Sequence, residues 1–143
     1  MQQWSLLRDQ GITNPKPRKQ FYRDLDTVIS KLREDNHSII LAGDFNESLG
    51  DDPEGLDRIT IKYGLCDCIS YRHGPYSTTT YSRGHKCLDC IVVSSDLLPS
   101  ICQSGILPFD SLFTSDHRAI FLDLDPSKSL GNPVQPLWSP ASR

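Results

Sequence analysis

The segment SIILAGDFNE, residues 38–47, joins an apolar run to a polar loop and is the most informative stretch of the chain. Ser38 to Ala42 is predicted to form a short strand buried on both faces, because the run is almost wholly apolar. Residues two apart in a strand point to the same side, so Asp44 and Asn46 are expected to project together where the strand ends. A carboxylate that activates water or holds a metal, beside an amide that donates to an oxyanion, is a hydrolytic pairing. A plain turn is the alternative, since both residue types favour turns.

A second polar position, Asp89, lies inside the apolar run 87–94. Strand alternation places Asp89 on one face with Ile91 and Val93, where an ionised carboxylate costs several kcal/mol unless a donor or a cation meets it. His117 stands at the head of another apolar run, and carboxylates commonly orient imidazoles. We therefore expect Asp89 to lie within hydrogen-bond reach of His117, at roughly 2.6–3.2 Å. A solvated Asp on an edge strand is the alternative.

The remaining pattern predicts an α/β fold. A helix is expected over residues 17–36, with one apolar face formed by Phe21, Leu25, Val28, Ile29 and Leu32. A second helix is expected to have Asp52 as its cap, Pro53 at its first position and Gly64 as its stop. Further strands are expected at residues 78–81, 87–94, 103–107 and 119–124, the first two joined by a turn near residues 83 and 84.

Composition limits the function classes. The 143 residues are expected to form one domain, and the net charge of −3 argues against a broad polyanion-binding surface. A phosphate-bearing substrate stays compatible with this charge, because a bound cation is often the largest charge in such a site. Basic residues occur in two short groups that form no block: Lys16, Arg18 and Lys19, then Arg83, Lys86 and Arg118.

Several segment classes are not recognisable in the sequence. Residues 1–10 are too polar for a secretory signal, and no apolar run has the ~20 residues of a membrane span. Five cysteines without a signal make a disulfide framework unexpected, so an intracellular location, cytoplasm or nucleus, is expected. Four prolines and few apolar residues predict a disordered tail over residues 126–143.

Three strings together resemble the endonuclease/exonuclease/phosphatase family, the metal-dependent phosphodiesterases and phosphatases that include DNase I-like and abasic-site nucleases. They are IILAGDFNE at residues 39–47, TYSRGHKCLDCIVVS at 80–94 and TSDHRAIFLDL at 114–124. Their order and spacing both fit the family, and residues 2–25 most resemble its retroelement-type branch or an uncharacterised eukaryotic branch. The resemblance implies a metal-dependent phosphodiester hydrolase acting on a phosphate-bearing substrate, with nucleic acid among the expected partners.

The resemblance also implies roles for matching residues. Asp44 would position and activate the attacking water, and Asn46 would contact the phosphate or help hold the metal. Asp89 would orient His117, which would stabilise the phosphoryl oxygens.

Two further residues complete the expected site. Asp116 would be a ligand of Mg²⁺ or Mn²⁺, and Arg83 would contact the substrate. Because Asp116 and His117 are adjacent, they would diverge in a regular strand, so both can reach one site only from a loop.

The resemblance covers only the C-terminal half of a four-layer α/β sandwich, so residues 1–125 are expected to be a truncated domain. The family's metal-binding Glu, supplied by an earlier strand, has no counterpart before Asp44. An inactive remnant or an interaction module of the same fold therefore stays an alternative. The apolar runs 39–42, 91–93 and 120–122 would line an exposed inner face, which predicts self-association or a partner that supplies the other half.

A zinc-binding module is a rival from another class. The pairs Cys66 with Cys68 and Cys87 with Cys90 superficially suit a four-cysteine site. Alternation puts Cys87 and Cys90 on opposite faces of their predicted strand, which disfavours a shared metal. Small buried apolar side chains are the favoured role for these cysteines.

Overall fold

The computed structural model describes residues 5, 8, 9, 11, 13, 16–76 and 78–129. The strands are β1 (Ile40–Asp44), β2 (Leu65–Asp67), β3 (Asp89–Ser94), β4 (Ile101–Ile106) and β5 (Ile120–Leu124). The helices are α2 (Pro17–Glu34), α3 (Leu56–Tyr63), α4 (Cys68–His73) and α5 (Pro126–Ser129), with the 3₁₀ helix η1 at Ser95–Ser100. Among these helices, none is both long enough and apolar enough to cross a membrane.

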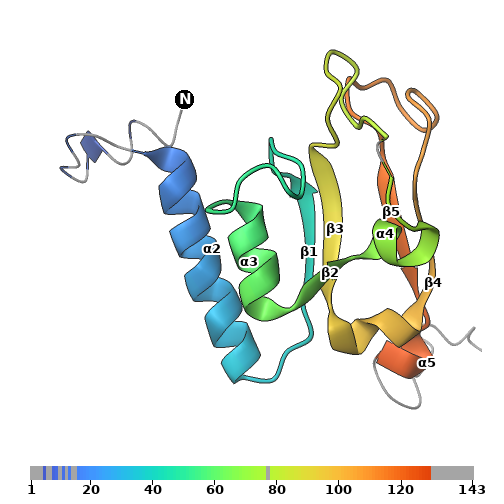
Figure 1. The fold of residues 1–143 in the computed structure, drawn as a ribbon, viewed down its shortest axis with the longest axis horizontal. Helices are drawn as coiled ribbons and strands as arrows, with labels where there is room; N and C mark the ends of the chain where they lie inside the picture. The colour runs from blue at the N-terminus through green and yellow to red at the C-terminus, as the bar shows by residue number, and fades with distance from the viewer. Residues whose placement is uncertain are drawn as a thin grey trace, which may run out of the picture.

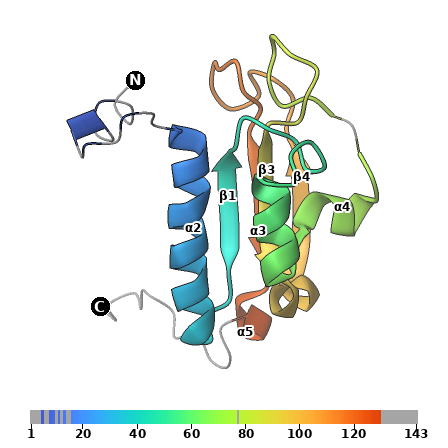
Figure 2. The ribbon, with the colours of Figure 1, turned by 60° about the vertical axis from the view of Figure 1, so that its left-hand side comes forward.

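The elements form an α/β arrangement of layers, as the sequence predicts (Figure 1). Strands β1, β3 and β2 form one antiparallel sheet with β3 in the centre, and β4 pairs with β5 in a second antiparallel sheet. Helices α2 and α3 lie on one side of the first sheet, and the second sheet lies on the other side with α4 (Figures 1 and 2). Strand β3 is therefore the centre of the molecule.

The alternation predicted for β3 is confirmed. Cys90 and Val92 pack in a core cluster with α2 and α3, whereas Ile91 and Val93 pack in a second cluster with α4, η1, β4 and β5. All six residues of β3 are buried. The expectation that residues 91–93 line an exposed face is therefore wrong, because the β4–β5 layer covers them.

The prediction of a first strand buried on both faces is also wrong. β1 begins two residues later than expected, pairs only with β3 among the described strands, and is mostly exposed. Ile39 is buried just before it, but Ile40 is half exposed. An edge strand can have the same apolar composition as a central strand, although it has a neighbouring strand on one side only. Composition alone therefore cannot distinguish an edge strand from a central one.

Helix α2 buries a different face from the one predicted. Tyr22 and Ile29 are its buried residues, and Leu25 packs partly against them. Three residues of the expected inner face are exposed instead: Phe21 at 41%, Val28 at 55% and Leu32 at 37%. The apolar side of α2 is thus wider than the surface that α3 and the sheet cover.

Two local predictions need correction. Residues 78–81 form no strand with 87–94; only Tyr81 makes an isolated bridge, and its partner is His117. Helix α3 begins at Leu56 with Gly55 as its N-cap, because Asp52 instead closes a turn by accepting the Glu54 and Gly55 backbone N–H groups. Gly64 ends α3 as predicted, with φ at +61°.

The first four residues of the predicted disordered tail, Pro126–Ser129, form helix α5. The rest of that prediction, residues 130–143, lies outside the described residues, as do most of residues 1–15.

Candidate active site

Two carboxylates face each other at the end of the β1–β3 ladder. Asp44 and Asp89 are direct partners in the antiparallel register, and opposed residues of such a pair project from the same face of the sheet. That face is the one that carries Ile91 and Val93 toward the second sheet. The Asp89 side chain is 13% exposed and that of Asp44 is 38% exposed. One carboxylate is thus enclosed, and the other is open to solvent.

His117 reaches these carboxylates from the segment before β5. Its Nδ1 lies 2.9 Å from Asp89 Oδ2, which confirms the expected hydrogen bond, and its Nε2 lies 3.9 Å from Asp44 Oδ2. The Tyr81 ring packs against the imidazole at 5.0 Å between centroids. The hydrogen bond to Asp89 raises the pKa of His117, and the charges of Asp89, Asp44 and Asp116 raise it further. The site therefore favours the imidazolium form.

Thr80 supports this arrangement and was not identified from the sequence. Its side chain is fully buried, and its hydroxyl accepts the backbone N–H groups of Leu88 at 2.8 Å and Asp89 at 3.1 Å. Its carbonyl accepts the Arg118 N–H at 2.8 Å. Thr80 thereby fixes the backbone of both Asp89 and the segment that carries His117. Thr80 is the last of three consecutive threonines, and nothing in the sequence marks it out from the other two for such a role.

Asn46 shapes the loop after β1. Its backbone has a φ of +53°, and its N–H donates to Asp44 Oδ1 at 2.9 Å. This turn fixes the Asp44 carboxylate, so the predicted turn and the predicted site coincide in one motif. The exposed Asn46 side chain makes no hydrogen bond with Asp44, Asp89 or His117.

Asp116 and Arg83 lie beside the cluster without joining it. The Asp116 carboxylate faces Arg83, with Oδ2 3.8 Å from Nη2, and both side chains are largely exposed. The neighbouring His117 points to Asp89 instead. The expected divergence of residues 116 and 117 is therefore present.

Asp44, Asp89 and His117 form the group suited to a metal ion. One ligand atom from each residue lies within 4.8 Å of the others, and this is the only such group of three His, Cys, Asp or Glu residues among the described residues. Two carboxylates, one of them open to solvent, suit a hard cation that keeps several waters, and the imidazole can join them as a ligand only in its neutral form. Asp89 accepts from His117 through Oδ2, whereas the Asp44 carboxylate lies beyond hydrogen-bond distance of the imidazole, at 3.9 Å.

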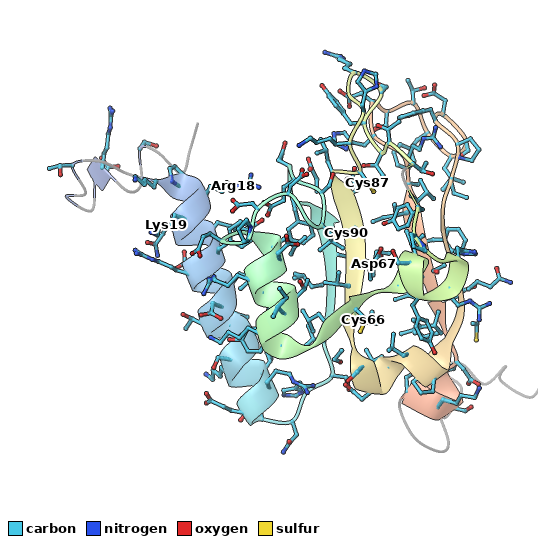
Figure 3. All side chains as sticks on the ribbon, viewed as in Figure 1. Arg18, Lys19, Cys66, Asp67, Cys87 and Cys90 are labelled. Atoms are coloured by element: carbon cyan, nitrogen blue, oxygen red, sulfur yellow. The ribbon has the colours of Figure 1, made fainter. Side chains whose placement is uncertain are left out.

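Among the described residues, the cysteines do not come together as the four-cysteine zinc site that was the rival prediction. Cys66 and Cys87 lie near opposite ends of the first sheet (Figure 3). Cys90 is buried in the cluster beside α3, and Cys68 is buried in the cluster beyond β3. Burial raises the pKa of Cys68 to about 11, which keeps its thiol protonated. Cys68 and Cys90 therefore behave as small apolar core residues, as predicted, whereas Cys66 and Cys87 are only partly buried.

Glu47 is a buried carboxylate whose role is not apparent from the sequence. Its Oε1 accepts the Tyr22 hydroxyl and the Leu56 N–H, the latter at 2.8 Å, and its Oε2 lies 2.8 Å from Arg18 Nη2. Arg18 also donates to the Phe45 carbonyl at 3.3 Å. Glu47 therefore caps α3 and ties the loop after Asp44 to α2. The three partners of Glu47 come from other parts of the chain, so no local pattern could reveal them.

Comparison with protein-family profiles identifies a family. A sequence profile described as the Endonuclease/Exonuclease/phosphatase family matches residues 9–117, which include Asp44, Asn46, Asp89 and His117. No curated protein matches the chain.

Proposed function

The chain belongs to the endonuclease/exonuclease/phosphatase family, and from that premise we propose that it is a metal-dependent phosphodiester hydrolase. The observation that carries the proposal is the position of His117 between two carboxylates, 2.9 Å from Asp89 and 3.9 Å from Asp44. Opposed like charges on a sheet are destabilising, so this pairing is costly unless a cation serves there. We attribute this costly pairing of Asp44 with Asp89 to a hydrolytic site.

The donor set fits Mg²⁺ or Mn²⁺, which prefer oxygen ligands. Asp44 would hold the ion, and Asn46 and Asp116 are the nearby residues that the family resemblance assigns to the same task. Bound there, the ion would stabilise negative charge on a phosphoryl oxygen and lower the pKa of a water molecule.

The protein's own residues supply the other steps. Asp44 is exposed and held by the Asn46 turn, so it can accept a proton from an attacking water. His117 donates Nδ1–H to Asp89, which leaves Nε2 as the nitrogen that donates to a phosphoryl oxygen. The raised pKa of His117 favours the protonated form that this donation needs. Asp89 is a positioning residue in this scheme.

Asn46 and Arg83 would contact the substrate. The Asn46 side chain is exposed beside Asp44, and its amide can donate to a phosphate oxygen. The Arg83 guanidinium is 76% exposed and only loosely paired with Asp116, so it can bind a phosphate. Nucleic acid is the substrate class that we propose first, because its backbone presents successive phosphodiesters.

Slow turnover is expected. No glutamate joins Asp44, Asp89 and His117 within the described residues, whereas the family resemblance calls for one as a metal ligand. The same observation favours a second candidate function, a metal-binding but catalytically inactive module of the same fold.

The test is hydrolysis of bis(p-nitrophenyl) phosphate and of a fluorescent oligonucleotide by the purified chain, with Mg²⁺, with Mn²⁺ and with EDTA. Metal-dependent cleavage that His117→Ala abolishes, in a variant that keeps the wild-type circular dichroism spectrum, would support the hydrolase. His37→Ala is the matched control, because His37 is exposed and its ring makes no described contact. Cleavage that survives both EDTA and His117→Ala would overturn the proposal. Metal-induced stabilisation without cleavage would favour the inactive module.

A further inference from the structure

A cavity lies on the α2 side of the loop that follows β1. It has a volume of about 440 Å³ and opens between the first turns of α2 and the start of α3. Arg18 and Lys19 extend from the N-terminal turn of α2 (Figure 3). The cavity is lined by five cationic side chains, two carboxylates and one tyrosine: Lys16, Arg18, Lys19, Arg23, Arg58, Asp52, Glu54 and Tyr22.

Two of these cations already have partners. Arg18 pairs with Glu47 at 2.8 Å, and Arg58 lies 3.6 Å from Asp26 and donates to the Tyr22 carbonyl. These contacts hold the two arginine side chains in place, and carboxylates already balance their positive charges.

The other three cations have no such partner. Lys16, Lys19 and Arg23 are exposed, and none makes an ion pair with any residue that the structure describes. The chain as a whole carries a net charge of −3, so this cavity is a local reversal of sign. The basic residues form no block in the sequence, but in the structure the helix brings Arg23, and the α2–α3 packing brings Arg58, to the group at 16–19.

Helix stability does not account for these charges. The N-terminal turn of a helix favours negative charge, because backbone N–H groups point outward there. The first turn of α2 contains no acidic residue and instead carries Arg18 and Lys19. Cations at this position work against the helix dipole. An anion in the cavity would be attracted both by these side chains and by the helix end.

We propose that this cavity binds a phosphate group of an anionic ligand through Lys16, Lys19 and Arg23. Lysine and arginine are the side chains that proteins use for phosphate, the arginine fork adding directional donors. Asp52 and Glu54 line the α3 side, so they confine the anion to the α2 side. The cavity is separate from the Asp44–Asp89–His117 cluster, although Arg18 touches the loop that joins them.

The direct experiment is a titration of ¹⁵N-labelled protein with inorganic phosphate at constant ionic strength, in EDTA, following the backbone amides of residues 16–23. Saturable shifts are expected in the wild type. The double variant Lys19→Gln/Arg23→Gln should weaken phosphate binding at least fivefold. The control Lys31→Gln/Arg72→Gln removes the same charges from exposed residues without ion pairs and should bind like the wild type.

A second arm identifies the source of the phosphate. A single-stranded oligonucleotide without terminal phosphates, added in competition, displaces inorganic phosphate if the cavity takes a backbone phosphodiester, and leaves it bound if the cavity takes a free or terminal phosphate. Either result supports the site. Shifts that do not saturate, that chloride reproduces, or that both double variants change equally would overturn it. No hydrolysis is measured, so the result stands or falls separately from the proposed hydrolase.

Discussion

Asp44 and Asp89 are opposed residues of the β1–β3 ladder, and their carboxylates share one face of the sheet. Like charges in this relationship destabilise a sheet. The imidazole of His117, within 4 Å of both carboxylates, offsets the repulsion when it is protonated. Asp44 and Asp89 therefore lower the stability of the sheet while they form the proposed site. Substitutions of either residue should change stability and activity in different ways.

Asp44→Asn should remove this repulsion while keeping the turn, since the amide oxygen can still accept the Asn46 N–H. In EDTA at about pH 9, where imidazole is neutral, we expect the variant to be more stable than the wild type by roughly 0.2–1 kcal/mol. Mn²⁺ should raise the melting temperature of the wild type but not that of the variant. Thermal melts with and without metal measure both effects.

Asp123→Asn is the control for this substitution, because Asp123 is exposed and its side chain has no described partner. It should leave both the melting temperature and the Mn²⁺ response unchanged. A less stable Asp44→Asn protein that still responds to Mn²⁺ would contradict the role given to Asp44.

Asp89→Asn should preserve the geometry and lose the charge that orients His117. An asparagine can accept from Nδ1–H, so the fold should persist, but the pKa of His117 should fall toward its ordinary value. Loss of a residue that orients a catalytic group typically costs 10- to 100-fold in activity, which we expect here. NMR titration of the His117 ring in EDTA, alongside rate measurements, tests the link. An unchanged His117 titration would show that Asp89 does not act through the imidazole.

The sequence was sufficient for the Asp89–His117 pair because each is a polar residue in or beside an apolar run, and an enclosed carboxylate needs a partner. The alternation along β3 was predictable for the same reason, since it depends only on neighbours in the chain. Both inferences rest on local pattern and the cost of burying charge.

The contacts of α2 were not predictable in this way. Which face of an amphipathic helix is buried depends on what packs against it, and Tyr22 is buried because Glu47 and α3 meet it there. The cationic cavity likewise exists only because α2 and α3 bring Arg23 and Arg58 together. These are long-range relationships that no motif encodes.

Glu47→Ala should destabilise the protein substantially. It would leave the buried Tyr22 hydroxyl and the Leu56 N–H without their acceptor, and Arg18 without its partner. An unsatisfied buried group costs about 1–3 kcal/mol, so we expect a loss of roughly 2–3 kcal/mol in urea unfolding. Glu54→Ala, on the exposed side of the same loop, should change stability by less than about 0.5 kcal/mol. Equal effects of the two substitutions would contradict the role of Glu47 as a structural centre.

We predict that the contact of Asp26 on α2 with α3 weakens in acid. Its carboxylate accepts from Lys62 Nζ and the Tyr63 hydroxyl, each at 2.7 Å, and these hydrogen bonds lower its pKa below the ordinary value of 3.8. A depressed pKa contributes stability above 3.8 that is lost as the pH falls through the folded-state value.

The matching experiment compares Asp26→Asn with the wild type. The variant should be less stable by about 1 kcal/mol at neutral pH, and the difference should shrink as the pH falls below 3.8. Urea unfolding across this range measures it. A difference that stays constant with pH would show that the charge of Asp26 contributes nothing.

The exposed apolar side of α2 predicts self-association. Phe21, Val28 and Leu32 lie on one stripe of the helix and are 37–55% exposed, and β1 presents an open edge among the described strands. We expect light scattering to show a mass that rises with concentration, and Val28→Lys to reverse this rise. Ile61→Lys is the control, since Ile61 is a more exposed apolar residue that stands alone on α3. A protein that stays monomeric at high concentration, or a control that acts as strongly as Val28→Lys, would show that this stripe is not an association surface.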